Sequence, residues 1–230
     1  MACSRSDKHD LSPVHGGVAC IARNNIGLSV LPHQPYPDVL SLQTPLYFVI
    51  VAYIVPVGSN WREWTDIDPR TQLAEAVLLC QLTDPEKCII VLGDLNARTG
   101  NTNSFTSLNV HSSLDDVVNT RDRWLKEFCN HNQLSILNGT HCEADSPGRY
   151  TCFQPNGCSI VDYVLVTVPF IPEIGNKALR IIRVDRFLSD HSCLQLTAPC
   201  IPRVLAPSNE RRVKRPVFSN VHRLPPLLNR

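Results

Sequence analysis

Three short segments of the chain place carboxylates where a hydrophobic run ends or is interrupted, which makes these acids candidates for catalysis or metal binding. The segments are Gly93-Asp94-Leu95-Asn96, Ile160-Val161-Asp162-Tyr163 and Leu188-Ser189-Asp190-His191-Ser192. A carboxylate within or beside a β-run is costly to bury unless it meets a cation, a hydrogen-bond donor or the water of a cleft. We therefore predict that the three acids share one site.

The residue types in these segments suit metal-assisted hydrolysis of a phosphodiester or phosphomonoester. Asp94 can accept a proton from water, and Asn96 can donate hydrogen bonds that orient the water or a phosphate oxygen. Asp190 offers a hard oxygen ligand for an ion such as Mg²⁺, next to the His191 imidazole, which can donate to a phosphate. Asp162 can hold that imidazole in one tautomer and keep it charged.

Each of these residues also has a structural explanation when it is taken alone. Asp94 with Asn96 is typical of a turn after a strand, and Asp190 with His191 is typical of a helix cap or a surface loop. Tyr53, within a hydrophobic strand, would usually belong to a core. Asp162 is the hardest to explain by structure alone, because apolar residues flank it within a β-run.

The elements that must position these residues are mostly strands. A helix is predicted from about residue 70 to 82, after an Asp68 N-cap and Pro69, and a second from about residue 121 to 131. Strand-like patterns cover residues 18–21, 28–31, 46–55, 88–92, 135–137, 150–153, 159–168, 179–184 and 193–196. This order predicts an α/β fold with two β-sheets packed face to face.

Composition is that of a soluble globular domain. The 230 residues are 43% hydrophobic with a formal net charge of +1, and the longest apolar run spans only residues 46–57. A bilayer-spanning helix needs about 20 apolar residues, so we predict no membrane segment. Residues 201–230 carry a net charge of +6 and residues 1–200 carry −5. Binding to a polyanion is therefore expected to be local, at a metal-containing cleft or at the basic tail.

Ten cysteines raise the question of disulfide bonds. The first residues lack the apolar core of a signal peptide, and most of the cysteines lie within apolar runs, where a free thiol packs as a small hydrophobe. We therefore predict an intracellular, reduced protein, nuclear or cytoplasmic. Cys152 and Cys158 have no matching second pair and the chain has no CxxC motif, so the spacing does not favour a zinc site.

A family resemblance rests on seven segments that occur in one order. They are His15-Gly16-Gly17-Val18-Ala19, Ala52-Tyr53-Ile54-Val55-Pro56, Gly93-Asp94-Leu95-Asn96-Ala97-Arg98, the helix from Trp124 to Asn138, Tyr150-Thr151-Cys152-Phe153, Ser159-Ile160-Val161-Asp162-Tyr163-Val164 and Ser189-Asp190-His191. The chain resembles the endonuclease/exonuclease/phosphatase family over about residues 15–197. The similarity is to the branch found in the reverse-transcriptase polyproteins of non-LTR (LINE-type) retrotransposons.

The resemblance implies a four-layer α/β sandwich of the DNase I type and a DNA endonuclease that nicks a target-site duplex. By this resemblance Tyr53 contacts the scissile phosphate, Asp94 positions and deprotonates the attacking water, and Asn96 orients the water and the phosphate. His191, paired with Asp162, stabilises charge on the phosphate oxygens. Mg²⁺ or Mn²⁺ is held by Asp190 together with Asp94 and Asn96. A reverse transcriptase domain downstream in a parent polyprotein is the implied partner.

The chain departs from the family pattern near its start. Family members begin with a strand–helix–strand unit whose Glu is the principal metal ligand, and only about 15 residues precede Gly16-Gly17 here. We therefore expect an irregular segment 1–14, a domain over 15–198 that lacks this unit, and a Pro/Arg-rich tail or linker over 199–230. Loss of the Glu is expected to weaken metal binding and activity. The alternatives are a catalytically dead remnant or nucleic-acid-binding module, and a phosphomonoesterase.

Overall fold

A computed structural model of the chain describes residues 2–3, 17–32, 38–63, 65–101, 111–140, 148–175 and 177–199. These residues belong to a compact unit that spans Met1–Cys200. The segment 1–14 and the tail 199–230, expected to be irregular, lie almost wholly outside the described residues, and His15 and Gly16 lie outside them entirely.

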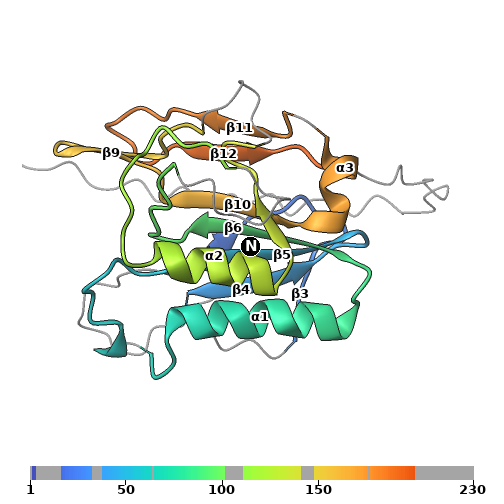
Figure 1. Ribbon diagram of the computed structural model, residues 1–230. Helices are drawn as coiled ribbons and strands as arrows, with labels where there is room; N and C mark the ends of the chain where they lie inside the picture. Colours follow the sequence, from blue (N-terminus) through green and yellow to red (C-terminus); the bar gives the residue numbers. More distant parts are fainter. Residues whose placement is uncertain are drawn as a thin grey trace, which may run out of the picture. The chain divides into compact units, whose positions relative to one another are not determined.

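A six-stranded mixed sheet forms the centre of the fold, with strand order β3-β4-β5-β6-β10-β7 (Figure 1). Its strands are β3 (Ser29–Val30), β4 (Val39–Gln43), β5 (Tyr47–Tyr53), β6 (Cys88–Asp94), β10 (Asp162–Thr167) and β7 (Leu134–Ile136). β5 and β6 pair in parallel, and the other neighbours pair antiparallel. The parallel pair needs a crossover connection, which is supplied by a helix.

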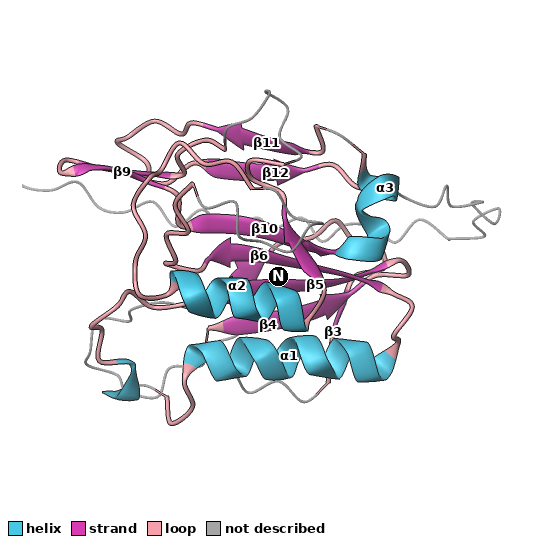
Figure 2. Ribbon diagram, viewed as in Figure 1, coloured by secondary structure: helices cyan, strands magenta, loops and turns pink. Residues whose placement is uncertain are grey.

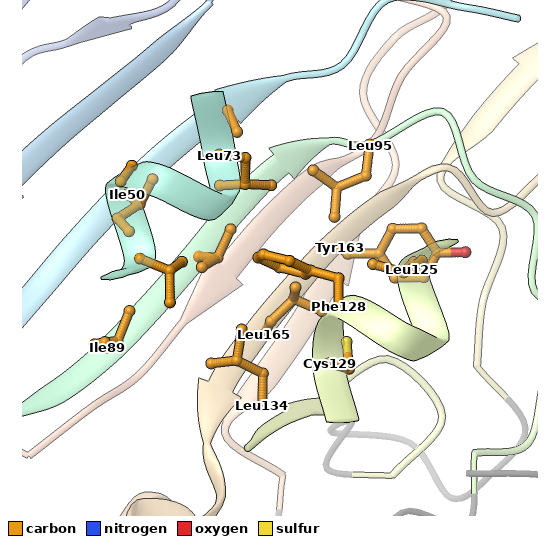
Figure 3. Close-up of a cluster of buried hydrophobic side chains, with 14 of the residues drawn as sticks. Ile50, Leu73, Ile89, Leu95, Leu125, Phe128, Cys129, Leu134, Tyr163 and Leu165 are labelled. Atoms are coloured by element: carbon orange, nitrogen blue, oxygen red, sulfur yellow. The ribbon is translucent and has the colours of Figure 1, made fainter. Parts of the chain in front are cut away.

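Helices α1 (Pro69–Thr83) and α2 (Asp122–His131) pack on one face of this sheet. The Asp68 side chain caps α1 by accepting a hydrogen bond from the Arg70 amide at 2.9 Å, as the Asp-Pro pair predicted. Figure 3 shows Leu73 of α1 and Leu125 and Phe128 of α2 among side chains of the strands. A single 3₁₀ turn, η1 (Trp61–Glu63), precedes α1. Within the described ranges no helix is both long and apolar enough to cross a bilayer.

The opposite face of the sheet carries a two-stranded antiparallel sheet, β11 (Leu179–Ile182) with β12 (Cys193–Leu196) (Figures 1 and 2). Leu194 and Leu196 pack there against a buried cluster that contains Val164 and Val166 of β10. The remaining elements are β1 (Ala2–Cys3), β2 (Ala19–Cys20), β8 (Cys152–Gln154), β9 (Gly157–Ser159), the 3₁₀ helix η2 (Val168–Phe170) and α3 (Ile171–Ile174). The predicted α/β class with packed sheets is confirmed.

Two predicted elements were wrong in their extent. The helix expected from Trp124 to Asn138 ends at His131, because Gln133 adopts φ +52° and the chain then enters β7. The other is a strand. Residues 159–168 form the end of β9 and then β10, separated by Ile160 and Val161. The Val161 carbonyl accepts from the Leu95 amide at 2.9 Å, and the Ile160 amide donates to the Asp115 carboxylate at 2.9 Å. These backbone groups of Ile160 and Val161 therefore form hydrogen bonds with loop residues and not with a neighbouring strand. Strand β4 was not predicted as a strand. The seven cysteines whose side chains the structure describes are all free.

Candidate active site

Tyr53, Asp94 and Asp162 form one row across three neighbouring strands. Asp94 of β6 is the register partner of Tyr53 in β5 and of Asp162 in β10. Register partners point to the same face of a sheet, and side chains two residues along a strand share that face. Leu92 and Val164 mark this face as the one that carries β11 and β12. The row therefore places a phenol and two carboxylates together at one edge of the sheet.

Gly93 permits the close approach of β5 and β6 next to this row. Its φ is +141°, and a Cβ at this position would lie 1.9 Å from the Ala52 carbonyl oxygen, which is far inside van der Waals contact. Only glycine fits such a position without moving the backbone. The Gly-Asp sequence thus has a steric reason, because Gly93 allows Asp94 to pair with Tyr53.

Asn96 holds the Asp94 carboxylate. Its backbone amide donates to Asp94 Oδ1 at 2.9 Å, and its side-chain nitrogen donates to Asp94 Oδ2 at 3.1 Å and to the Ile54 carbonyl at 3.0 Å. Asn96 adopts φ +48°, a left-handed conformation that Asn tolerates better than most residues. Both hydrogens of its amide group are thus engaged within the protein, and its Oδ1 is the atom left to face a ligand.

The ring of His191 is paired with Asp162. Nδ1 lies 2.8 Å from Oδ2 and 3.0 Å from Oδ1 of that carboxylate. The hydrogen bond that the ring donates to Asp162 raises the pKa of His191 to about 9 despite partial burial, and the charges of Asp162, Asp94 and Asp190 add to this effect. His191 is therefore an imidazolium at neutral pH, with Nδ1 donating to Asp162 and Nε2 left as a second donor.

The surroundings of Asp94 disfavour its charged form, whereas those of His191 favour the charged ring. Burial, followed by repulsion from Asp162, raises the pKa of Asp94 to about 7, although the Asn96 amide, His191 and Arg121 favour the charged form. A carboxylate with a pKa near neutrality is a stronger proton acceptor than an ordinary one and is still largely ionised at physiological pH. Asp94 is therefore suited to take a proton from water.

Thr151 forms hydrogen bonds both with the start of β10 and with the segment that carries His191. Its hydroxyl accepts from the amides of Val161 and Asp162, both at 3.1 Å, at the start of β10. Its carbonyl accepts from the Ser192 amide at 2.7 Å, beside His191. Thr151 belongs to one of the family-like segments, but its residue type and spacing did not indicate that it positions Asp162 and His191, because these contacts form only in the folded chain.

Donor atoms form two groups that share His191. In one, single donor atoms of Asp94, Asp162 and His191 all lie within 4.8 Å of one another, and in the other the same holds for Cys152, Asp190 and His191. The structure therefore brings Asp94, Asp162 and His191 into contact range. Asp190, an exposed residue, adjoins them through His191.

Arg121 lies behind the site and was not singled out from the sequence. Its guanidinium is buried and donates to the Ile54 carbonyl at 3.5 Å, the same oxygen that accepts from Asn96. Burial lowers the pKa of Arg121, followed by repulsion from Arg70, while its charge in turn lowers the pKa of Asp94. In the sequence, Arg121 is a single basic residue at the start of a predicted amphipathic helix, and this pattern alone does not indicate a role in a site.

A partly buried ion pair fixes the loop that follows Asn96. Arg98 binds Asp115 through Nε at 2.8 Å and through a second contact at 2.5 Å. Burial raises the pKa of Asp115, but hydrogen bonds from Arg98 and from two backbone amides outweigh it, so that the pKa lies below its ordinary value. One of those amides belongs to Ile160, so this pair also anchors the approach to β10.

This α/β fold is that of the DNase I-like nucleases, with its polar cluster at one edge of the central sheet. Residues 48–195 match the sequence profile of the endonuclease–reverse transcriptase family, and the chain belongs to that family. The resemblance stated from the sequence is thus confirmed. No curated protein sequence matches the chain.

Two solved structures with TM-scores of 0.50 share the fold, and a third is similar at a lower score. The 3′ phosphatase NExo from Neisseria, bound to product DNA hairpin, has a TM-score of 0.50 and 14% identity, covering 75% of this chain and 70% of that chain. The 3′-5′ exonuclease NExo from Neisseria meningitidis has a TM-score of 0.50 and 16% identity, covering 74% and 68%. The endonuclease domain of TRAS1, a telomere-specific non-LTR retrotransposon, has a TM-score of 0.44 and 18% identity, covering 73% and 67%.

Proposed function

We propose that the chain is a divalent-metal-dependent DNA endonuclease that hydrolyses one phosphodiester bond of a target duplex. The observation that carries this proposal is the joint placement of Asp94, Asp162 and His191, whose donor atoms lie within 4.8 Å of one another. A proton acceptor, a charged donor and the carboxylate that orients it thus share one edge of the sheet. Membership of the endonuclease–reverse transcriptase family supports a nucleic-acid substrate.

Three residues act on the reacting atoms in this mechanism. Asp94 accepts a proton from the attacking water, for which a pKa of about 7 is well matched to neutral pH. His191, held by Asp162 through Nδ1, donates from Nε2 to a phosphate oxygen as negative charge develops there. Tyr53 lies beside Asp94 in the row and contacts the scissile phosphate. Asn96 is a positioning residue, because its donors hold Asp94.

Carboxylate oxygens of the kind that Mg²⁺ or Mn²⁺ prefer lie in the two donor groups that share His191, with Asp94 in one and Asp190 in the other. The carboxylates of Asp94 and Asp190, with Oδ1 of Asn96, are the atoms that would hold such an ion. Repulsion from Asp162 contributes to the raised pKa of Asp94, which is the signature of adjacent carboxylates that a cation would relieve. When bound, the ion supplies charge neutralisation at the phosphate.

A loop over residues 183–189 leads into Asp190 and provides a surface for duplex DNA. Phe187 and Leu188 are 85% and 81% exposed, and Arg186 lies over the Phe187 ring at 5.5 Å. Arg183 stacks on Phe153 of β8, which places a cation beside the site. Arginines bind phosphates, and exposed apolar side chains can enter the minor groove between base steps. We infer that this loop contacts the target duplex.

The product of this reaction suits the partner that the family description names. Hydrolysis of one strand leaves a free end in a duplex, and such an end can serve as a primer for reverse transcription. We therefore propose that the chain acts with a reverse transcriptase, which the family couples to the endonuclease.

Nicking of supercoiled plasmid tests the proposal. With Mg²⁺ or Mn²⁺ the chain should convert plasmid to the open circle, Asp94→Ala should abolish this conversion, and the exposed-site control Asp66→Asn should retain it. An oligonucleotide with a 3′-phosphate and a small aryl phosphate, assayed in parallel, separate phosphodiester from phosphomonoester hydrolysis. Nicking no faster than that of Asp94→Ala would leave a catalytically dead, nucleic-acid-binding remnant as the function.

A further inference from the structure

Cys152, Asp190 and His191 form a second donor group beside the site, and it differs from the first in chemistry. One donor atom of each lies within 4.8 Å of the other two. Cys152 is 4% exposed, Asp190 is exposed and His191 lies between these extremes. The group is therefore open to solvent on the carboxylate side and closed on the thiol side.

The backbone holds this group in place on both sides. Cys152 and His191 form an antiparallel bridge, so strand β8 lies directly against the segment around residue 191. The Phe153 amide donates to the Asp190 carbonyl at 2.8 Å, and the Ser192 amide donates to the Thr151 carbonyl at 2.7 Å. Because hydrogen bonds flank the bridge, the three side chains share a fixed frame instead of meeting on a free loop.

The surroundings of His191 match those of a metal-binding histidine. Ligating imidazoles usually donate their second ring N–H to a carboxylate, which fixes the ring and increases its basicity. Here Nδ1 pairs with Asp162 at 2.8 Å, so Nε2 is the nitrogen available to a metal.

We infer that Cys152, His191 and Asp190 form an inhibitory Zn²⁺ site, with Sγ, Nε2 and a carboxylate oxygen in three tetrahedral positions and water in the fourth. A thiolate with an imidazole and a carboxylate is a donor set typical of Zn²⁺ and unsuited to Mg²⁺, which prefers oxygen. The sequence did not favour a zinc site because its cysteines lack paired spacing. The group arises only where the fold brings β8 against the residue 191 segment.

Zinc at this position would engage His191 and Asp190, which both have roles in the proposed reaction. Nε2 of His191 could no longer donate to a phosphate oxygen, and Asp190 could no longer help to hold Mg²⁺. This effect on nicking rests on the function proposed above, whereas zinc binding itself does not.

Metal binding by the full chain is the first test, and Cys158→Ser is the matched control. Cys158 lies on the adjacent strand β9 and is exposed. Competition with a chromogenic chelator should show one Zn²⁺ per wild-type chain, at least tenfold weaker binding by Cys152→Ser, and unchanged binding by Cys158→Ser. With Co²⁺ as the probe, a thiolate charge-transfer absorption should be present in wild type and missing in Cys152→Ser. Equal Zn²⁺ affinity of wild type and Cys152→Ser would overturn the inference.

Inhibition is the second test. Micromolar Zn²⁺ with excess Mg²⁺ should suppress plasmid nicking by wild type, a chelator should restore it, and Cys152→Ser should resist the inhibition. Equal inhibition of both proteins would place the zinc effect at the Mg²⁺ ligands and contradict the inference. If neither protein nicks DNA, the proposed function fails while the zinc titration still decides whether the site exists.

Discussion

The carboxylate of Asp162 lies 2.8 Å from Nδ1 of His191, although 29 residues separate the two in sequence. β10 supplies the acid, and the segment before β12 supplies the imidazole. Thr151 joins these two regions through its hydroxyl and its carbonyl. The charge state of His191 is therefore a product of the tertiary fold, and it can be changed at Asp162 without touching the ring.

Asp162→Asn should lower the pKa of His191 from about 9 toward its ordinary value of 6.5, because the largest cause of the shift is the hydrogen bond with this carboxylate. Nicking at pH 7.5 should fall on the order of 10²-fold, since the charged donor is lost. NMR titration of the ring measures the pKa directly. The Asp66→Asn control should keep it at about 9, and an unchanged value in Asp162→Asn would contradict the assignment.

Asp94→Asn should abolish nicking and raise the free energy of unfolding. The pKa of Asp94 is raised from 3.8 to about 7 in the folded protein, so ionisation destabilises the fold as pH rises through that interval. Without metal, the variant should gain on the order of 1 to 3 kcal/mol in free energy of unfolding at pH 8 and little at pH 4. Urea denaturation at the two pH values measures this, and nicking should be lost. The same stability difference at both pH values would exclude the proposed burial of charge.

Gly93→Ala should destabilise the protein and abolish nicking, because its Cβ would meet the Ala52 carbonyl oxygen at 1.9 Å. Gly157→Ala is a close control: its φ of +143° matches the +141° of Gly93, but its Cβ would meet nothing within 4 Å. Any loss of stability in Gly93→Ala beyond that in Gly157→Ala therefore measures the clash with the Ala52 carbonyl between β5 and β6. We expect that excess to be about 2 kcal/mol or more by thermal denaturation. Equal losses would show that backbone strain alone sets the requirement.

Arg121→Gln should shift the acid limb of the pH–rate profile to higher pH. The positive charge of Arg121 lowers the pKa of Asp94, and nicking should rise with pH as Asp94 ionises around pH 7 and fall above about pH 9 as His191 loses its proton. Removing the charge should slow nicking at pH 6 by roughly 2- to 5-fold and have less effect at pH 8. The exposed neighbour Arg123→Gln provides the control. A uniform loss across the pH range would indicate a purely structural role.

Replacing Phe187 and Leu188 together by Ser should weaken binding to duplex DNA about tenfold, which corresponds to about 1.4 kcal/mol. The salt dependence of binding should not change, because no charge is removed. Fluorescence anisotropy in the Asp94→Asn background measures affinity without cleavage. Leu82→Ser, at a side chain of α1 that is 74% exposed, should bind as before. Unaltered affinity of the double variant would remove the 183–189 loop from the DNA surface.

Sequence analysis expected the three acids to share one site, and the register of β6 and β10 places two of them, Asp94 and Asp162, side by side. Asp94 closes a continuous apolar run, which is a local signal, whereas Asp162 was expected within a strand and begins β10 instead. The helices were also predictable, since Asp68 and Pro69 give α1 a local start signal. These features depend on periodicity and caps, which are local properties of the chain.

Contacts that cross the fold could not be predicted in the same way. Thr151, Arg121 and the pair Arg98–Asp115 act through partners distant in sequence, and residues of these types are common in loops and helices without such roles. The break between β9 and β10 was missed because Ile160 and Val161 are apolar and continue the pattern of a strand. Only the hydrogen bonds of their backbone, made to loops, separate the two elements.

The segment that carries Asp190 and His191 joins β11 to β12, a pair of strands separate from the central sheet in the described part of the chain. Asp94 and Asp162, by contrast, are built into that sheet. Partial melting of the β11–β12 layer would withdraw the imidazole while the two acids kept their places. We therefore expect heat or mild denaturant to abolish the proposed nicking at a stage when the helices and most of the central sheet are still intact.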